Sequence, residues 1–433
     1  MAAKLVVISM DAMISEDIPN LNRHPFFHAF LKDAACVQRV KSIYPTLTYP
    51  CHTTMVSGLW PDRHGVTANE AFLPGISPLP WLFDHSAVRC RDLFDLCKAN
   101  GLTTAAVGWP VTGNHPSIDW LVDEIWTIGT PWTGESMRET LLSAGTAPEV
   151  YERAVRPFEN LRVPRRQPAS SFFNMEAACA ILKEYRPDVL MIHTGNFDNY
   201  RHKKGVISDL TEKAAEESDR MLGMLLAAIE ETEKPEEYNI VITSDHGQLD
   251  FRRYACPNVL LAENGYISLR EDGSVKEWRA WCLSAGMSAQ IFLKDPSDRS
   301  LYKEVHELLE ERRRRGDAGF SVIYTAEELK EKEHLAGDFS FVLETDGETA
   351  FQNAWSGPYF VPAACEPGTN HAGAHGFHPD KGPRPVLLGR GPAFRKNAFL
   401  ENADLVDLAP TFAAALGLVL PDADGRVLTE ILA

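Results

Sequence analysis

Short apolar runs rich in β-branched residues alternate along this chain with longer segments of helical periodicity, and this alternation restricts the possible folds most strongly. The apolar runs lie at residues 5–10, 103–109, 189–193, 240–243 and 385–388. Helical patterns occupy residues 89–100, 174–185, 208–233 and 406–416. Continuous apolar runs of this length are typical of strands that are buried on both faces. The sequence therefore predicts an α/β fold with a mostly parallel central sheet and helices on both of its faces.

Several side chains of the kinds that bind metals follow these apolar runs or lie in the glycine-rich segment 370–376. These residues are Asp11, Asp198, His202, Asp245, His246 and His375. Open α/β sheets bind ligands at the carboxyl ends of their strands, so these side chains are expected to share one site. Asp198 and His202 are four residues apart, so a helical turn or a tight loop brings both to one ion. Mixed nitrogen and oxygen ligands of this kind suit Zn²⁺, with Mn²⁺, Fe²⁺ or Co²⁺ as substitutes.

Two regions interrupt the alternation. Residues 111–172 are rich in Pro, Gly, Thr and Trp, and we expect a long loop-rich excursion over one edge of the sheet. Residues 256–350 mix patterns and include charged helical segments at 301–315 and 325–333. Because strand-like runs resume afterwards, we expect residues 256–350 to be an inserted cap subdomain. Residues 1–255 plus 351–433 would then form the catalytic domain.

The composition restricts the partners and the compartment. The chain has 433 residues and a net charge of −17, which argues against a nucleic-acid polymer or an anionic membrane as a partner. No run approaches the roughly 18 apolar residues of a membrane span. The N-terminus is typical of a first strand and not of a signal peptide, and the eight cysteines show no framework spacing. We therefore expect a cytoplasmic protein with reduced thiols, and the oligomeric state stays open.

Residues 42–66 contain the strongest catalytic signal. Thr48 is a favourable N-cap residue and Pro50 is allowed in a first helical turn, so the Thr48 hydroxyl is expected at a helix N-terminus. Free N–H groups at such a terminus attract an anionic phosphoryl group. A threonine hydroxyl is a weak nucleophile near neutral pH, but a metal ion bound to its oxygen makes the alkoxide accessible. Taken by itself, the segment fits a helix cap with no catalytic role.

The residues from Pro45 to Val66, which include Pro45-Thr46-Leu47-Thr48-Tyr49-Pro50-Cys51-His52, resemble the nucleophile segment of the alkaline phosphatase superfamily. Within it they are most similar to the nucleotide pyrophosphatase/phosphodiesterase (type I phosphodiesterase) family. Residues 404–426 resemble the C-terminal run of the superfamily, and the resemblance covers most of residues 1–250 and 365–433. It implies an alkaline-phosphatase-like fold. It also implies hydrolysis of phosphodiester or pyrophosphate bonds in small molecules or nucleotides, through a phosphothreonine at Thr48.

The resemblance further implies two divalent metal ions. One would be held by Asp198, His202 and His375, and the other by Asp11, Thr48, Asp245 and His246. Asn69 matches the family asparagine that hydrogen-bonds a phosphoryl oxygen. Tyr49 matches the aromatic residue that stacks on the base in nucleotide-cleaving members.

The chain departs from the family pattern at a few positions that are not ligands, namely Cys51, Ser57, Arg201 and the Phe377-His378-Pro379 run. The histidines without an implied role are expected to be structural, and they are His52, His64, His371 and His378. Diesters are expected to be preferred over monoesters, because Asn69 and Tyr49 are uncharged and a monoester dianion needs an extra cation. Arg201 and Lys203 are the residues that could supply that charge.

Several alternatives are separated by residue type. Phosphonoacetate hydrolases share the threonine and the metal ligands and are the closest rival, and a phosphomonoesterase of the same superfamily is a further alternative. Sulfatases need Cys or Ser in a C/S-x-P-x-R segment, which this chain lacks at Thr48. A non-catalytic binding protein would have lost a ligand or the nucleophile. A nucleotide-dependent oxidoreductase would carry GxGxxG after its first strand, where this chain has Asp11-Ala12-Met13.

Overall fold

A computed structural model of the chain describes residues 4–125, 134–162, 166–363 and 371–433. Its largest element is an eight-stranded sheet with the strand order β19-β2-β18-β6-β1-β5-β3-β4. The strands are β1 (Lys4–Met10), β2 (Ala35–Lys41), β3 (Thr104–Val107), β4 (Trp120–Val122), β5 (Val189–Thr194), β6 (Tyr238–Thr243), β18 (Leu387–Arg390) and β19 (Phe399–Asp404). All neighbours are parallel except the pairs that β18 makes with β2 and β6. The predicted mostly parallel sheet is therefore confirmed.

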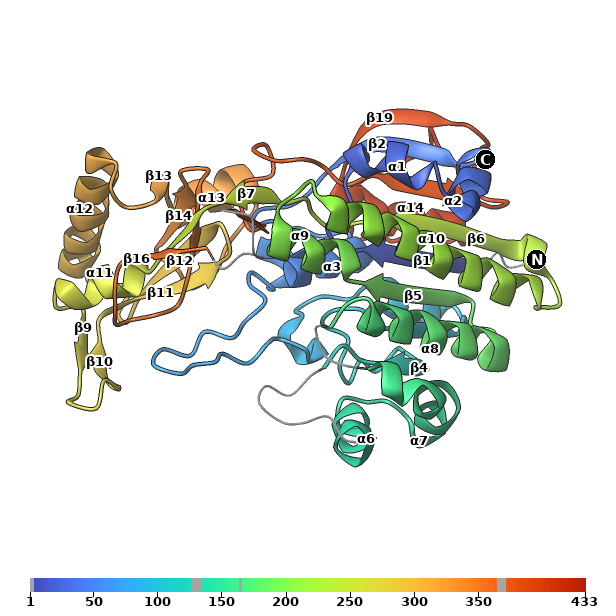
Figure 1. Cartoon of the computed structure of the whole chain (residues 1–433), viewed down its shortest axis with the longest axis horizontal. Helices are drawn as coiled ribbons and strands as arrows, with labels where there is room; N and C mark the ends of the chain where they lie inside the picture. The colour runs from blue at the N-terminus through green and yellow to red at the C-terminus, as the bar shows by residue number, and fades with distance from the viewer. Residues whose placement is uncertain (1–3, 126–133, 163–165, 364–370) are drawn as a thin grey trace.

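Both faces of the sheet are buried, because successive residues of the central strands enter different cores. Val6 and Ile8 of β1 pack in one core, whereas Leu5 and Val7 pack in the other. The first core includes α2 (Pro25–Leu31), α8 (Ala169–Tyr185) and α10 (Asp209–Glu230), and the second includes α3 (Thr48–Ser57), α5 (Leu93–Ala99) and α14 (Leu408–Ala415). Figure 1 shows α8 and α10 running along the strands on the face turned to the viewer. Double burial explains why the central strands read as continuous apolar runs.

Some elements differ from the sequence-based expectation. Residues 111–172 do not form loops alone: they contribute the edge strand β4 and the helices α6 (Gly134–Ser143) and α7 (Pro148–Val150), with residues 126–133 and 163–165 outside the described part. Strands β2 and β19 were also not expected. Both are only partly buried, so neither presents the continuous apolar run on which strand prediction relied.

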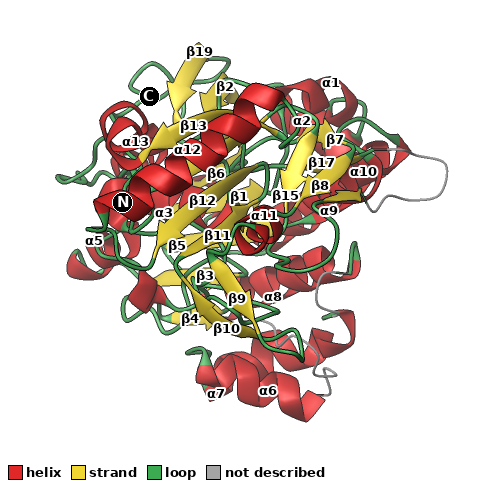
Figure 2. Ribbon diagram, turned by 90° about the vertical axis from the view of Figure 1, so that its left-hand side faces the viewer, coloured by secondary structure: helices red, strands yellow, loops and turns green. Residues whose placement is uncertain are grey.

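Between β6 and β18 the chain forms a second, smaller body, which lies at the left of Figure 1 and faces the viewer in Figure 2. An antiparallel sheet in the order β11-β12-β14-β13 packs against α12 (Arg299–Arg315). Its strands are β11 (Ala280–Ala285), β12 (Ser288–Leu293), β13 (Phe320–Thr325) and β14 (Phe341–Thr345), and α11 (Pro257–Glu263), α13 (Ala326–Glu333), β9 (Ile267–Leu269) and β10 (Val275–Trp278) complete this body. The expected charged helices at residues 301–315 and 325–333 correspond to α12 and α13.

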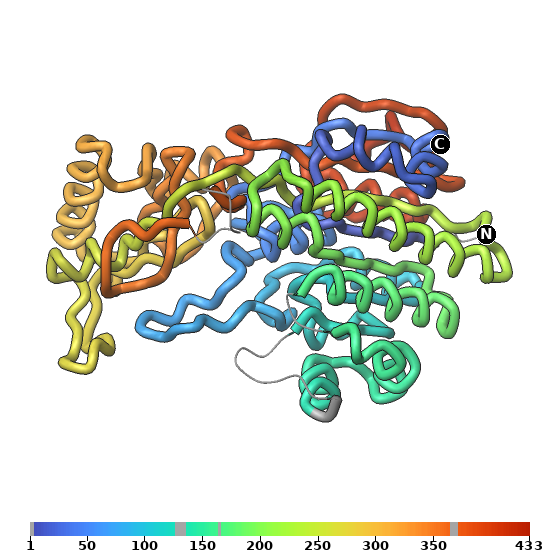
Figure 3. Tube along the Cα trace, in the orientation of Figure 1, coloured from blue at the N-terminus to red at the C-terminus, as the bar shows by residue number. Residues whose placement is uncertain are grey.

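Two small sheets join this body to the large sheet. One has the order β15-β8-β16, with β8 (Arg253–Ala255), β15 (Thr349–Phe351) and β16 (Phe360–Pro362), and the other pairs β7 (Leu249–Phe251) with β17 (Ala372–Ala374). The trace in Figure 3 shows the chain passing from the large sheet into the smaller body and back. The division into a cap of residues 256–350 and a catalytic domain stays a prediction. Within the described ranges, no helix has the length and apolar character needed to cross a membrane.

Candidate metal centre and active site

Thr48, Asp11, Asp245 and His246 converge at the carboxyl ends of β1 and β6. The Nε2 atom of His246 lies 3.3 Å from Thr48 Oγ1, 3.5 Å from Asp11 Oδ1 and 3.3 Å from Asp245 Oδ2. Asp11 follows β1, and Asp245 and His246 follow β6, so the parallel pairing of these strands brings the three together. Thr48 is the first residue of α3, with Leu47 in the N-cap position. The Thr48 hydroxyl therefore lies at a helix N-terminus as expected, although Thr48 is one residue inside the predicted cap position, and it faces His246.

The oxygens of this first cluster fit a divalent cation. Within the described residues, Asp11 Oδ1 and Asp245 Oδ2 are buried and have no hydrogen-bond partner. Burial and the neighbouring carboxylates of Asp245 and Asp198 raise the pKa of Asp11 well above its usual range. Unpartnered buried carboxylate oxygens are costly, and a bound cation removes that cost. Asp11, Asp245 and His246 also lie close enough together to hold one ion.

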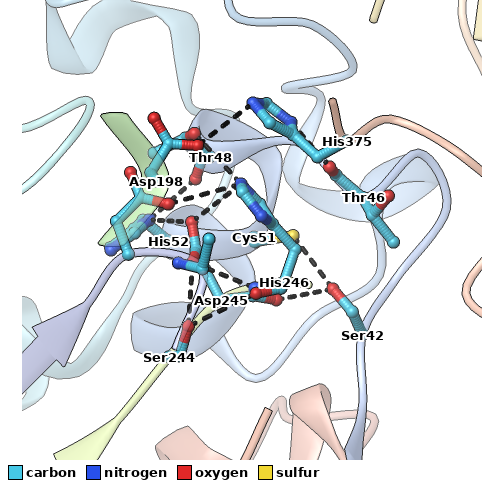
Figure 4. A network of polar contacts seen from close by, with 12 residues as sticks. Ser42, Thr46, Thr48, Cys51, His52, Asp198, Ser244, Asp245, His246 and His375 are labelled. Carbon is cyan, nitrogen blue, oxygen red and sulfur yellow. Dashed lines mark hydrogen bonds and ion pairs between the residues drawn. The ribbon is translucent and has the colours of Figure 1, made fainter. Parts of the chain in front are cut away.

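Asp198, His202 and His375 form a second cluster beside the first. Asp198 Oδ1 lies 3.1 Å from His202 Nε2 and 3.7 Å from His375 Nε2. Asp198 and His202 are on α9 (Asn196–Lys204), and His375 follows β17, which contacts α9. The rings of His246 and His375 stack with centroids 4.0 Å apart, so the two clusters adjoin. Figure 4 shows Thr48, Asp198, His246 and His375 turned toward one another.

Backbone carbonyls orient both histidines of the second cluster. His202 Nδ1 lies 2.8 Å from the Gly373 carbonyl, and His375 Nδ1 lies 3.0 Å from the Thr46 carbonyl. A carbonyl only accepts, so Nδ1 donates in each ring and the lone pair of Nε2 points toward Asp198. Metal-binding histidines are typically held in this way. Burial, together with nearby His246, lowers the pKa of His375 to about 3, which keeps its ring neutral.

The two clusters open into a cavity of about 530 Å³ whose lining includes Asp11, Thr48, Asn69, Asp198 and His375. The backbone N–H of Tyr49 donates to Asn69 Oδ1 at 2.9 Å. Because Oδ1 accepts this bond, the Nδ2 group of Asn69 is the donor that the side chain can offer to a ligand. The cavity is therefore large enough for a small phosphodiester and places a neutral donor beside Thr48.

Tyr49 lies one layer behind the cavity. Its side chain is fully buried and packs with Val66 and Val111. Its ring contacts Trp81 edge-on with centroids 5.1 Å apart, and Trp81 lines the cavity whereas Tyr49 is not among its lining residues. Stacking of Tyr49 on a base stays a prediction, and the aromatic residues that line the cavity are Trp81, Phe173 and Tyr254.

The two residues that could have supplied an extra positive charge, Arg201 and Lys203, have other partners and do not line the cavity. Arg201 is fully buried, and its Nη2 donates to both carboxylate oxygens of Asp17 at 2.7 and 2.8 Å. The Lys203 ammonium lies over the Tyr200 ring, 6.0 Å from its centroid. Arg162 lines the cavity instead, and its Nη2 donates to the Ile125 carbonyl at 2.7 Å. Its position was not indicated by the sequence, because residues 111–172 were expected to be loops.

His193 is a second residue that sequence reasoning missed. It lines the cavity, and its Nε2 lies 3.2 Å from Asp11 Oδ2 while its Nδ1 lies 3.1 Å from the Gly108 carbonyl. The available signal was its position at the end of the apolar run 189–193, where the chemistry-bearing residues of the other strands lie. Gln248, which donates through Nε2 to Asp198, also lacked any sequence signal.

The remaining histidines have structural partners. His52 Nδ1 lies 2.8 Å from the Thr48 carbonyl, and further contacts are made by His64 with Thr54, by His371 with Asp250 and by His378 with Glu333. His85, Asp92 and His115 form another group close enough to hold an ion. However, His115 Nδ1 accepts from the Ser117 N–H, so its Nε2 carries the hydrogen and donates to Asp92. A ring in that state has no lone pair left for a metal.

Comparisons with known proteins agree with this architecture. The family model described as type I phosphodiesterase / nucleotide pyrophosphatase matches residues 5–378. Human ectonucleotide pyrophosphatase/phosphodiesterase family member 1 is 23% identical over 228 residues, which are 52% of this chain and 21% of that protein. Human family member 5 is 22% identical over 407 residues, which are 91% of this chain and 70% of that protein. The chain thus spans only about a fifth of the length of the first of these relatives.

A solved structure shares the fold over the whole chain. Murine ectonucleotide pyrophosphatase/phosphodiesterase 5, as an inactive variant in complex with AMP, superposes with a TM-score of 0.69 at 20% identity, covering 100% of both chains. The alkaline-phosphatase-like α/β fold that the sequence implied is therefore confirmed.

Proposed function

This chain belongs to the type I phosphodiesterase / nucleotide pyrophosphatase family, and we propose that it hydrolyses phosphodiester or pyrophosphate bonds with Thr48 as the nucleophile. The observation that supports this most strongly is the convergence of Thr48 Oγ1, Asp11 Oδ1 and Asp245 Oδ2 around His246 Nε2, at 3.3 to 3.5 Å. A hydroxyl and two unpartnered carboxylate oxygens that gather around one imidazole nitrogen are a fitting arrangement for a cation that activates the hydroxyl.

Two divalent ions are part of the proposal. Asp11, Thr48, Asp245 and His246 would hold one ion, and Asp198, His202 and His375 the other, with Zn²⁺ favoured by the mixed nitrogen and oxygen ligands. Such ions supply positive charge that favours the Thr48 alkoxide and offsets the charge on the leaving oxygen. We also propose that the protein acts in the cytosol, since the seven cysteines of the described residues are all free.

The reaction proceeds as a double displacement at phosphorus. Thr48 Oγ1 forms a bond to phosphorus while the bond from phosphorus to the leaving oxygen breaks, so the retained phosphoryl group is carried on Thr48. Water then attacks the same phosphorus, which releases the product and restores the Thr48 hydroxyl. Asn69 Nδ2 donates to a non-bridging oxygen. Losing one donor of this type costs about 2.7–4 kcal/mol in the transition state.

A phosphomonoester or a phosphonate is the second candidate substrate, and Arg162 is the observation that favours it. Arg162 lines the cavity and is held by backbone carbonyls, so it places a cation where the sequence indicated none. Burial lowers its pKa to about 10, so the guanidinium remains charged near neutral pH. Glu70 and Glu124 line the same cavity and oppose an additional negative charge, and for this reason we favour the diester.

A panel assay tests the proposed function. The zinc-loaded protein is compared on a nitrophenyl phosphodiester, a nitrophenyl phosphomonoester, a dinucleotide and phosphonoacetate. We expect a higher kcat/KM for the diester than for the monoester and no release of phosphate from phosphonoacetate. A diester-to-monoester ratio below one would assign the second candidate instead.

A further inference from the structure

Arg201 is a buried cation that the proposed reaction does not use. It lies on α9 between Asp198 and His202, and none of its surface is exposed. The chain departs from the family pattern at this position, so the resemblance gives no role for Arg201. Because Arg201 does not line the cavity, any effect it has on the reaction must pass through other residues.

The guanidinium links α9 to the loop that follows β1. Its Nη1 donates to the Ala12 carbonyl at 2.7 Å, and its Nη2 donates to both carboxylate oxygens of Asp17 at 2.7 and 2.8 Å. Asp17 Oδ2 also accepts from the backbone N–H of Ile14 at 2.9 Å. A guanidinium can bind several partners at once, because it carries five N–H donors in a fixed planar arrangement. One side chain therefore holds both ends of the loop from Ala12 to Asp17.

Ala12 connects this contact to the metal ligands. Its backbone N–H donates to Asp245 Oδ1 at 3.2 Å, and the carbonyl of the preceding Asp11 accepts from the Asp198 N–H at 3.2 Å. Ala12 has a φ of 57°, a left-handed conformation that residues with a Cβ atom adopt rarely and keep only where contacts hold them. The hydrogen bond from Arg201 to the Ala12 carbonyl is such a contact. It therefore supports the backbone that directs two ligands of the first proposed ion, Asp11 and Asp245.

The pairing with Asp17 means that Arg201 acts through geometry and not through charge. Asp17 is only 7% exposed, and its carboxylate offsets the guanidinium charge within a buried ion pair. The pair as a whole leaves little net charge to act on a phosphoryl group or on a metal ion. What the pair can fix is the distance between α9 and the loop after β1.

We propose that Arg201 is a positioning residue that fixes the segment Asp11–Ala12 against α9, and so sets the position of the first metal cluster relative to the second. The inference rests on the proposed function, because these clusters are the ones assigned there to the two ions. Without Arg201 the ligands remain, but the backbone support that directs Asp11 and Asp245 at one ion is lost. We expect one zinc ion to bind at least about tenfold more weakly, and kcat to fall at least about tenfold with KM unchanged.

Two variants separate positioning from simple stability. Arg201→Met removes the donors but leaves Asp17 buried without its cationic partner, which destabilises the fold by itself. Arg201→Met combined with Asp17→Asn removes this unpaired charge, and the asparagine oxygen can still accept from the Ile14 N–H. We expect the double variant to recover most of the melting temperature that the single variant loses, but to recover neither zinc affinity nor kcat. Competition with a chromophoric chelator measures the zinc affinity, and the melting temperature is taken on metal-free protein.

Tyr200→Phe is the matched control, because it removes a buried hydrogen bond of the same helix, from the Tyr200 hydroxyl to Glu217 of α10 at 3.0 Å. It should lower the melting temperature and leave zinc affinity and kcat unchanged. A double variant with the zinc affinity and kcat of the wild type would overturn the inference, and so would a Tyr200→Phe variant that loses both. In either case, two bound zinc ions and diester turnover in the wild type would still support the proposed function. A wild type that binds fewer than two zinc ions and cleaves no diester overturns both.

Discussion

We predict that His193 contributes to the affinity for the first proposed metal ion, and its replacement by alanine tests this. His193 and Asp11 are only 4% and 5% exposed, and His193 Nε2 lies 3.2 Å from Asp11 Oδ2. The Gly108 carbonyl and the ionised Asp11 Oδ2 both only accept, so the ring donates from both nitrogens, as an imidazolium does, and leaves Oδ1 directed at His246. Removing the donor leaves a buried carboxylate oxygen without this partner, which costs about 1–3 kcal/mol.

The free energy lost with this hydrogen bond can be expressed as a loss of metal affinity. At about 1.4 kcal/mol per tenfold, the lost hydrogen bond weakens binding of one zinc ion by roughly 5- to 150-fold. Removing a residue that hydrogen-bonds a metal ligand generally lowers metal affinity about 10- to 100-fold, and this range agrees with the value worked out here for His193. The affinity is measured by competition with a chromophoric chelator, and the melting temperature of the metal-free protein reports the fold.

Two further variants separate orientation of Asp11 from simple packing. His193→Gln keeps a donor near the Nε2 position and should recover much of the affinity. His193→Asn keeps a donor only near Nδ1, opposite the Gly108 carbonyl, and should not. If His193→Ala binds both zinc ions as tightly as the wild type, or if the Gln and Asn variants behave alike, the reasoning is refuted.

Three other predictions concern the nucleophile, a buried histidine and the thiols. Thr48→Ala should abolish turnover with zinc content and melting temperature nearly unchanged, and more than slight residual activity would favour direct attack by water. Burial lowers the pKa of His64 to about 3 from 6.5, so the unfolded state binds more protons between these values and stability falls as the pH drops through that window. Denaturant titrations at several pH values should show that the free energy of unfolding falls less with decreasing pH for His64→Asn than for the wild type. The difference is at most about 1.4 kcal/mol per unit of the pKa shift. Thiol titration of denatured, unreduced protein should return all eight cysteines, and native disulfides in a peptide map would contradict this.

The parts of the fold that were predicted from the sequence are those with a local signal. β1, β5 and β6 are buried on both faces, so their apolar runs identified them directly. β2 mixes buried, partly buried and two adjacent exposed residues, and β4 is only three residues long, so neither stood out. The start of α3 was misplaced by one residue, because Leu47 occupies the N-cap position in place of Thr48.

The residues of the candidate site also divide into those with a local sequence signal and those without one. Asp11, Asp245 and His246 follow buried strands, and the family resemblance supplied the grouping that the structure now brings together. The place of Trp81 depends on contacts across the fold that no pattern in one sequence records, whereas His193 carried a signal only in its position at the end of the apolar run 189–193. The link from Glu70 to Asn353 spans 283 residues, and it exists only because the smaller body packs against the segment that contains Thr67 and Glu70.

The stereochemistry at phosphorus tests the central claim most directly. A nitrophenyl phosphorothioate diester that is chiral at phosphorus is hydrolysed by the zinc-loaded enzyme in ¹⁸O-labelled water. Attack by Thr48 followed by attack of water inverts the phosphorus twice, so we predict overall retention of configuration. Overall inversion would mean that water attacks phosphorus directly, and would contradict the role of Thr48 as the nucleophile.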